Sequence, residues 1–87
     1  DYLTELWELQ EGKCALSGLE LYMPKKAREQ RGPKCTASID RIDNSKGYIK
    51  GNVQWVYKVV NILRGTLTID RFYELCNTIS DYDRGIR

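Results

Sequence analysis

Apolar residues near the start of the chain recur at the spacing of a helix. An amphipathic helix is predicted over residues 2–10, with Gly12 as a stop signal after it. The next segment, residues 13–23, has strand-like residues on both sides of Ser17-Gly18, which predicts a hairpin or knuckle. The apolar face of the helix consists of Leu3, Leu6 and Trp7.

The middle of the chain changes from alternating to helical spacing. Alternation over residues 37–42 predicts a short strand, residues 44–47 supply a turn, and Tyr48-Ile49 form a predicted second strand. Asn52 is suited to cap a helix over residues 53–64. That helix has a wide apolar arc and a narrower polar arc. The polar arc contains Gln54, Tyr57, Lys58, Asn61 and Arg64.

After Gly65, a second apolar stripe predicts the last helix, for which Thr68 supplies a cap. The stripe is expected to close the core against the central helix. The polar tail, residues 80–87, is expected to fray. The stripe consists of Ile69, Phe72, Cys76 and Ile79.

The length of 87 residues suits one small domain with a single core. Hydrophobic residues at 41% and charged residues at 30% exclude collagen-like and strongly disordered classes. No apolar run approaches the roughly 18 residues of a membrane span, and no signal peptide opens the chain, so a soluble, unexported chain is expected. Because it begins at Asp1 rather than Met, we expect a segment excised from a longer protein.

Charge is distributed unevenly, although the net charge is only +2. Residues 1–23 carry −4, residues 24–64 carry +7 and residues 65–87 carry −1. A proline-bracketed loop over residues 24–34 holds five of the bases. The basic middle predicts a surface that faces a polyanion, although a solvated run of charge is the commoner reason for such a segment.

Histidine is absent, which excludes Ser-His-Asp triads, Cys-His nucleophile pairs and His-rich zinc sites. The three cysteines, Cys14, Cys35 and Cys76, include no C-x-x-C pair and fit neither a disulfide scaffold nor a four-thiolate zinc site. They are expected to be reduced thiols that serve mostly in packing. Trp7 and Trp55 are expected in the core.

Polar residues in the segment 36–65 follow a particular order and spacing. They are Asp40-Arg41, Ser45-Lys46-Gly47, Asn52, Asn61 and Arg64-Gly65. This set resembles the HNH (ββα-metal) nuclease family, in which Asp-His ends the first strand, Asn precedes the helix, and His or Asn lies near the helix end. Upstream, Cys14-Ala-Leu-Ser17-Gly18 resembles the family's zinc knuckle with its second Cys replaced, which implies a fold without structural zinc.

The resemblance implies an α+β fold in which a small ββα-metal core, also called the HNH or His-Me finger, is flanked by N- and C-terminal helices. It implies one HNH-like nuclease domain over residues 1–87, with its motif core at 36–65, in a cytoplasmic protein encoded by a bacterium or a phage. The expected activity is divalent-metal-dependent hydrolysis of DNA phosphodiester bonds.

The resemblance also assigns roles to residues. Asp40 and Asn61 are expected to bind one Mg²⁺ or Mn²⁺. Asn52 is expected to hold the loop before the helix through side-chain hydrogen bonds to the backbone. The expected partner is DNA, whose phosphates are to be neutralised by Lys46, Lys58 and Arg64.

Arg41 departs from the family, which has at this position the His that activates water. Arginine stays protonated at pH 7 and cannot ordinarily accept a proton. Arg41 is therefore expected to hold water or transition-state oxygens electrostatically, or else Asp43 or Tyr48 supplies an unusual base. The departure leaves open a catalytically impaired HNH-fold module that binds DNA. A small protein-interaction domain that uses the acidic first helix is a further alternative.

Overall fold

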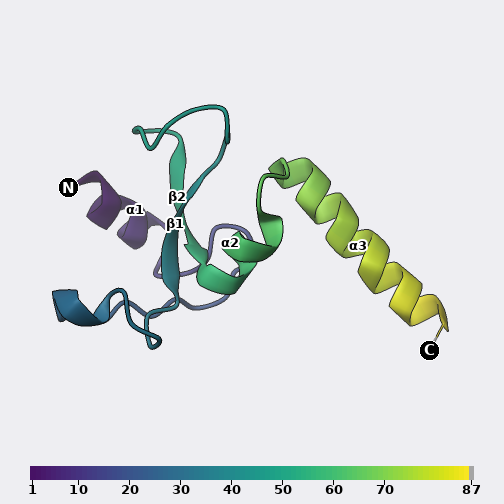
Figure 1. The fold of residues 1–87 in the computed structure, drawn as a ribbon, viewed down its shortest axis with the longest axis horizontal. Helices are drawn as coiled ribbons and strands as arrows, with labels where there is room; N and C mark the ends of the chain where they lie inside the picture. Colours follow the sequence, from purple (N-terminus) through teal and green to yellow (C-terminus); the bar gives the residue numbers. More distant parts are fainter. Residues whose placement is uncertain (87) are drawn as a thin grey trace.

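The computed structural model describes residues 1–86, which form an α+β structure with an antiparallel pair of strands (Figure 1). The predicted fold class is confirmed at this level, and the arrangement is compatible with a ββα-type core. No helix within the described residues is long and apolar enough to cross a membrane. In chain order the elements are α1 (Tyr2–Leu9), η1 (Ala27–Glu29), β1 (Ala37–Arg41), β2 (Val53–Tyr57), α2 (Lys58–Arg64) and α3 (Ile69–Ile86).

The two strands and α2 form the centre of the molecule. β1 pairs with β2 in a register that runs from Ala37 opposite Tyr57 to Arg41 opposite Val53. Valine and the aromatic residues of β2 suit a pleated, half-buried strand, and Val56 is completely buried. α2 follows β2 without an intervening loop and contacts both strands (Figure 1).

The predicted boundaries of the second strand and of the central helix are wrong. Tyr48 and Ile49 lie exposed in the loop between the strands, and residues 53–57 form β2 instead of the start of the helix. An apolar run of this length fits either a wide helical arc or a strand, so periodicity alone cannot separate the two. Pairing with β1 satisfies the backbone of residues 53–57, and the helix begins only at Lys58.

The opening segment folds as predicted. Asp1 caps α1, because its Oδ1 accepts a hydrogen bond from the Thr4 amide at 2.9 Å. After α1, the Cys14 amide donates to the Leu19 carbonyl at 2.8 Å. Gly18 takes a left-handed φ of 75° within the turn, which a glycine adopts without a steric cost. The predicted chain reversal at Ser17-Gly18 is confirmed, with an isolated antiparallel bridge between Lys13 and Glu20, and α1 packs against β2.

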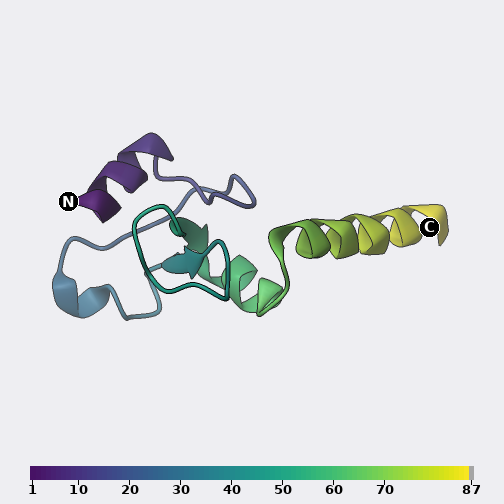
Figure 2. The same ribbon diagram turned by 90° about the horizontal axis from the view of Figure 1, so that it is seen from above.

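α3 projects away from the rest of the molecule, as two perpendicular views show (Figures 1 and 2). Phe72 near its start is buried, whereas Cys76 and Ile79 are exposed. The radius of gyration of 14.5 Å exceeds the value of about 12 Å for a compact domain of this length. The prediction that the apolar stripe closes the core therefore holds at Phe72 and is wrong further along.

The helix also continues beyond its predicted end. Residues 80–86 belong to α3, so the prediction of a frayed tail is wrong for them, and residue 87 lies outside the described residues. No proline interrupts this stretch, and Arg84 lies in the last turn, where a cation interacts favourably with the helix dipole.

Candidate functional site

A buried ion pair lies where the end of β1 meets the end of α2. Arg64 Nη1 donates to both carboxylate oxygens of Asp40, at 2.9 Å to Oδ1 and 2.7 Å to Oδ2. Gln54, which is opposite Asp40 in the strand register, donates its Nε2 to Oδ2 at 3.0 Å. Asp40 is 5% exposed and Arg64 is 1% exposed. The charge of Asp40 is therefore balanced inside the protein, and each of its oxygens has a partner.

Arg64 also donates to three backbone carbonyls. Its Nη1 reaches the Arg41 oxygen at 2.8 Å, its Nη2 reaches the Ile42 oxygen at 3.0 Å, and its Nε reaches the Leu67 oxygen at 2.8 Å. One planar guanidinium thus joins the end of β1 to the turn after α2. The prediction that Arg64 lies on an exposed arc to neutralise phosphate is wrong.

Asn61 lies one helical turn before Arg64 and contacts the same strand. Its Nδ2 donates to Ser38 Oγ at 3.1 Å and, at a longer 3.5 Å, to the Ile39 carbonyl. Ser38 and Asp40 are two residues apart in β1, so their side chains leave the strand on one face. The structure therefore brings Asp40 and Asn61 to the same face of β1.

The orientation of α2 reverses what its amphipathic pattern predicts. Asn61 and Arg64, assigned to the polar arc, face β1. Its apolar side chains instead lie at the surface, with exposures of 53% for Val59, 77% for Ile62 and 67% for Leu63. The pattern correctly groups residues by face, but the buried ion pair determines which face turns inward.

Asp40 and Asn61 do not form a ready site for a divalent cation. Mg²⁺ and Mn²⁺ prefer oxygen ligands together with room for water and phosphate. Both Asp40 oxygens instead face the positive charge of Arg64, and the Asn61 amide nitrogen is directed at β1. Among residues 1–86, no three His, Cys, Asp or Glu side chains form a group that could hold a metal ion. The donor set in this arrangement does not fit the ion.

Asn52 fastens the loop between β1 and β2. Its Oδ1 accepts from the Asp43 amide at 2.9 Å, and its Nδ2 donates to the carbonyls of Asp43 at 3.1 Å and Gly47 at 2.9 Å. The predicted use of this side chain to hold a loop is confirmed, and the residue is buried. However, the loop precedes β2, and the prediction that Asn52 caps a helix is wrong.

Asp43 lies in the same loop and is held by Ser45. Its Oδ1 accepts from the Ser45 hydroxyl at 2.6 Å and from the Ser45 amide at 2.9 Å. These two hydrogen bonds, and to a smaller extent the charge of Lys46, hold the pKa of Asp43 below its ordinary value. A lower pKa makes Asp43 a weaker proton acceptor, which disfavours it as the replacement base.

Arg41 lies along the outside of this loop. Its Nη1 donates to the Lys46 carbonyl at 3.3 Å, and its guanidinium carbon lies 5.2 Å from the centroid of the Tyr48 ring. The side chain is half-buried and follows the loop backbone, whereas Asp40 is paired with Arg64. Its position at the end of β1 is the predicted one, and its role in chemistry stays a prediction.

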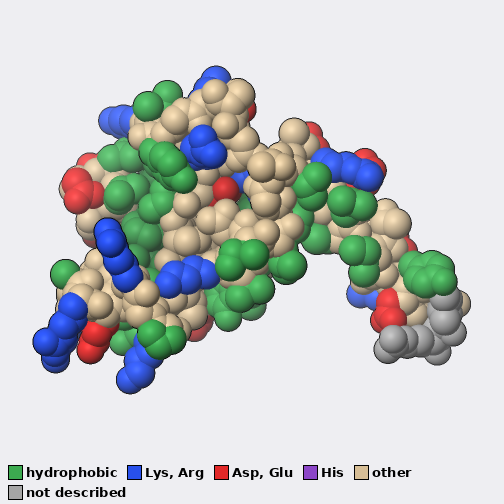
Figure 3. Space-filling model, in the orientation of Figure 1, with side chains coloured by type: hydrophobic (Ala, Val, Ile, Leu, Met, Phe, Trp, Pro, Cys, Tyr) green, Lys and Arg blue, Asp and Glu red, His purple; other side chains and the backbone are tan. Residues whose placement is uncertain are grey.

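The remaining basic side chains of the middle segment lie at or near the surface. Lys46 is exposed and Lys58 is half-buried. The loop over residues 24–34 adds five exposed bases, and lysine and arginine side chains gather on the side of the molecule where η1 lies (lower left in Figure 3). The loop belongs to the basic middle that is predicted to face a polyanion, although the predicted phosphate contacts, Lys46, Lys58 and Arg64, do not include it.

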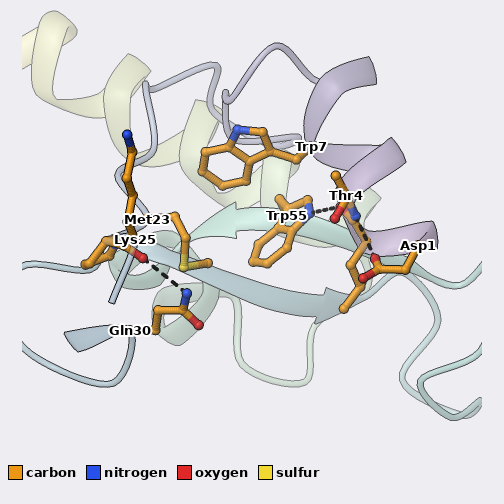
Figure 4. A pocket seen from close by; sticks show the side chains of 9 residues that line it. Asp1, Thr4, Trp7, Met23, Lys25, Gln30 and Trp55 are labelled. Atoms are coloured by element: carbon orange, nitrogen blue, oxygen red, sulfur yellow. Dashed lines mark hydrogen bonds between the residues drawn. The ribbon is translucent and has the colours of Figure 1, made fainter. Parts of the chain in front are cut away.

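A groove lies between α1 and the loop that follows Tyr22, with a volume of about 510 Å³. Figure 4 shows Trp7 and Trp55 in the middle, with Met23 and Lys25 to one side. The two indole rings meet edge to face, with centroids 5.3 Å apart. Both rings are half-buried, so the prediction of core positions holds only in part. The sequence gives no direct sign of this groove, because its walls come from separate elements.

The cysteines divide by location. Cys14 and Cys35 are buried and serve in packing as predicted, whereas Cys76 is exposed. Burial raises the pKa of the Cys14 thiol, but hydrogen bonds, chiefly from Ser17, outweigh this effect and lower the pKa below its ordinary value. Ser17 thus contacts the thiol from the position at which the knuckle resemblance expects a second cysteine.

Compared with models of known protein families and with curated proteins, the sequence has no match. The likeness to HNH nucleases therefore depends on the spacing of the polar residues and on the order of strand, loop, strand and helix. These features describe the arrangement of the core, whereas any activity depends on the chemistry of the side chains.

Proposed function

We propose that this chain is a ββα-type domain that binds DNA through the phosphate backbone. The observation that carries the proposal is the location of the bases in residues 24–64. Seven of these ten side chains are exposed, two are half-buried, and the one buried base, Arg64, is already neutralised by Asp40. The segment's excess of positive charge therefore lies at the surface, where phosphates can reach it.

The expected mode of binding is electrostatic and largely independent of DNA sequence. α2 is only seven residues long, and its outer face carries Val59, Ile62 and Leu63, which are not suited to read base edges in the major groove. Contacts from lysine and arginine to phosphate release counterions from DNA, so affinity falls steeply with added salt.

Fluorescence anisotropy with a labelled DNA duplex, measured over a series of salt concentrations, tests this function. Lys46→Gln should weaken binding and reduce the salt slope by about one. Lys13→Gln removes the same charge from outside the basic segment and should change binding little. Absence of binding at low salt, or an affinity that does not respond to salt, contradicts the proposal.

A second candidate is the metal-dependent DNA endonuclease that the HNH resemblance implies. The observation in its favour is that Asn61 of α2 faces the side of β1 on which Asp40 lies. Against it stands the pairing of Asp40 with Arg64, which gives both carboxylate oxygens other partners. Arg41 occupies the position of the family's base in this candidate.

Incubation of the domain with supercoiled plasmid, in Mg²⁺, in Mn²⁺ or in a chelator, separates the two candidates. Asn61→Ala is a cleaner control than Asp40→Ala, because loss of Asp40 leaves a buried arginine without a counter-ion. An endonuclease nicks the plasmid only with metal and loses this activity in Asn61→Ala. Intact plasmid in every condition, together with salt-dependent duplex binding, supports the binding function alone.

A further inference from the structure

We propose that the groove between α1 and the loop after Tyr22 receives an unpaired base of single-stranded DNA, while the basic loop over residues 24–34 holds the neighbouring phosphates. This inference deepens the proposed DNA-binding function and rests on it. It assigns the substrate class, a strand with at least one unstacked base, to a groove about 510 Å³ in volume, which is within the usual range for small-molecule sites.

The two tryptophans supply the surface for stacking. Their planes are 87° apart, so the edge of one ring meets the face of the other. The contact between the two rings occupies one ring face, and Gly12 lies next to the Trp7 indole. Base stacking on aromatic side chains tolerates any sequence, because every base has a flat face, and this agrees with a sequence-independent phosphate contact.

The walls of the groove are held in place by hydrogen bonds. Trp55 donates its Nε1 to the Leu3 carbonyl at 2.9 Å, which ties its indole to α1. Gln10 also binds the Trp55 backbone, accepting from its amide at 3.0 Å and donating to its carbonyl at 2.9 Å. On the other wall, Gln30 donates to the Pro24 carbonyl at 3.1 Å. A groove fixed in this way loses little conformational entropy when a base enters.

Charge around the groove selects a nucleic acid over an acidic peptide and sets its orientation. Lys25 lines the groove, and the loop to which it belongs carries five exposed bases against Glu29 alone. The opposite wall includes Asp1 and belongs to the acidic helix α1. Phosphates are favoured on the loop side, and an uncharged base can lie next to the acidic wall. An acidic peptide would bring its carboxylates against that wall.

Intrinsic fluorescence gives a direct test, because the two tryptophans are the only ones in the chain and both line the groove. The wild-type protein is titrated with a thymine oligonucleotide, with a duplex of equal length and with polyglutamate. The single strand should quench tryptophan emission and bind more tightly than the duplex, and polyglutamate should not quench. Equal quenching by duplex and single strand, or quenching by polyglutamate, overturns the inference.

Variants extend the test. Trp7→Leu should weaken single-strand binding at least about fivefold, since stacking on an aromatic ring is lost, whereas Trp7→Phe should retain most of it. Tyr82→Ala removes an exposed aromatic ring from α3 and should have no effect. Circular dichroism establishes that each variant is folded. If Trp7→Leu is unfolded, the single-strand affinity of Lys25→Gln is compared with that of Lys13→Gln. Lys25→Gln should bind the single strand more weakly, and equal affinities contradict the proposal that the strand occupies the groove.

The result also separates this inference from the proposed function. Duplex binding that depends on salt, without quenching or preference for the single strand, supports the phosphate-binding function and overturns the inference that a base enters the groove. Failure of both single strand and duplex to bind at low salt removes both.

Discussion

Two ion pairs in this molecule have opposite surroundings. Asp40 and Arg64 join β1 to α2 and are almost fully buried. Arg71 and Glu74 lie three residues apart on the surface of α3, with their side chains 50% and 65% exposed. The buried pair connects parts of the chain that are distant in sequence, whereas the exposed pair connects neighbours that the helix already holds together.

The two pairs differ in their access to water, which hydrates the exposed charges but cannot reach the buried ones. Removing two charges from water is costly, and a buried pair is tolerated only when further hydrogen bonds satisfy the remaining donors and acceptors. Arg64 meets this condition through three backbone carbonyls, and Asp40 meets it through Gln54. The exposed pair needs no such support and contributes little. Arg64 of α2 is therefore structural, whereas the exposed pair of Arg71 and Glu74 on α3 is replaceable.

Of the variants that test this comparison, Asp40→Ala should have the largest effect on stability. It leaves the Arg64 charge buried without a counter-ion, and the free energy of unfolding should fall by about 3–5 kcal/mol. Urea denaturation followed by circular dichroism measures the loss. The double variant Asp40→Leu with Arg64→Leu removes both charges and should be more stable than Asp40→Ala alone. The opposite order would show that the carbonyl contacts of Arg64, rather than its charge balance, dominate.

Asn52→Ala should have the next largest effect, because it removes three hydrogen bonds that hold the loop between β1 and β2. The expected loss in the free energy of unfolding is about 1–3 kcal/mol, since buried backbone groups lose their partners. Asn44→Ala, in the same loop, is the matched control and should change stability by less than about 0.5 kcal/mol. Equal losses from the two variants would contradict the fastening role of Asn52.

How far the sequence predicts this molecule is clearest in α2. The order of strand, loop, strand and helix follows from the turn residues and the Asn52 position, although the second strand is misplaced. Spacing also groups Asn61 with Arg64 on one face. It cannot show that this face is buried, because hydrophobic periodicity assumes that polar residues face water. Arg64 faces inward because it pairs with Asp40, which lies 24 residues earlier in the chain. Such a contact forms only in the folded protein, so the spacing of residues within the helix does not predict it.

A smaller effect is expected at Asp43, because the hydrogen-bond partners of its carboxylate lie within its own loop. Ser45→Ala should raise the pKa of Asp43 toward its ordinary value, as a pH titration of the carboxyl resonance by NMR would show. The pKa in the folded protein is lowered, so the contribution to stability is fully present above the unfolded pKa and is lost as the pH falls through the folded value. The stability difference between wild type and Ser45→Ala should therefore be greater near pH 6 than near about pH 2. An unchanged pKa would show that Ser45 does not stabilise the ionised form.

Glu74→Gln should have the smallest effect and completes the comparison. The variant keeps the shape and helix propensity of the side chain but removes its charge, so it tests the electrostatic contribution of the exposed pair with Arg71. The free energy of unfolding should change by about 0.5 kcal/mol or less, and the change should vanish when salt screens the charges. Urea denaturation at low and high salt, in parallel with Asp40→Ala, makes the measurement. Because the Asp40 pair is buried and screened much less, its loss should persist at high salt. A loss of several kcal/mol in Glu74→Gln that persists at high salt would mean that the exposed pair behaves like the buried one and that burial does not distinguish the two pairs.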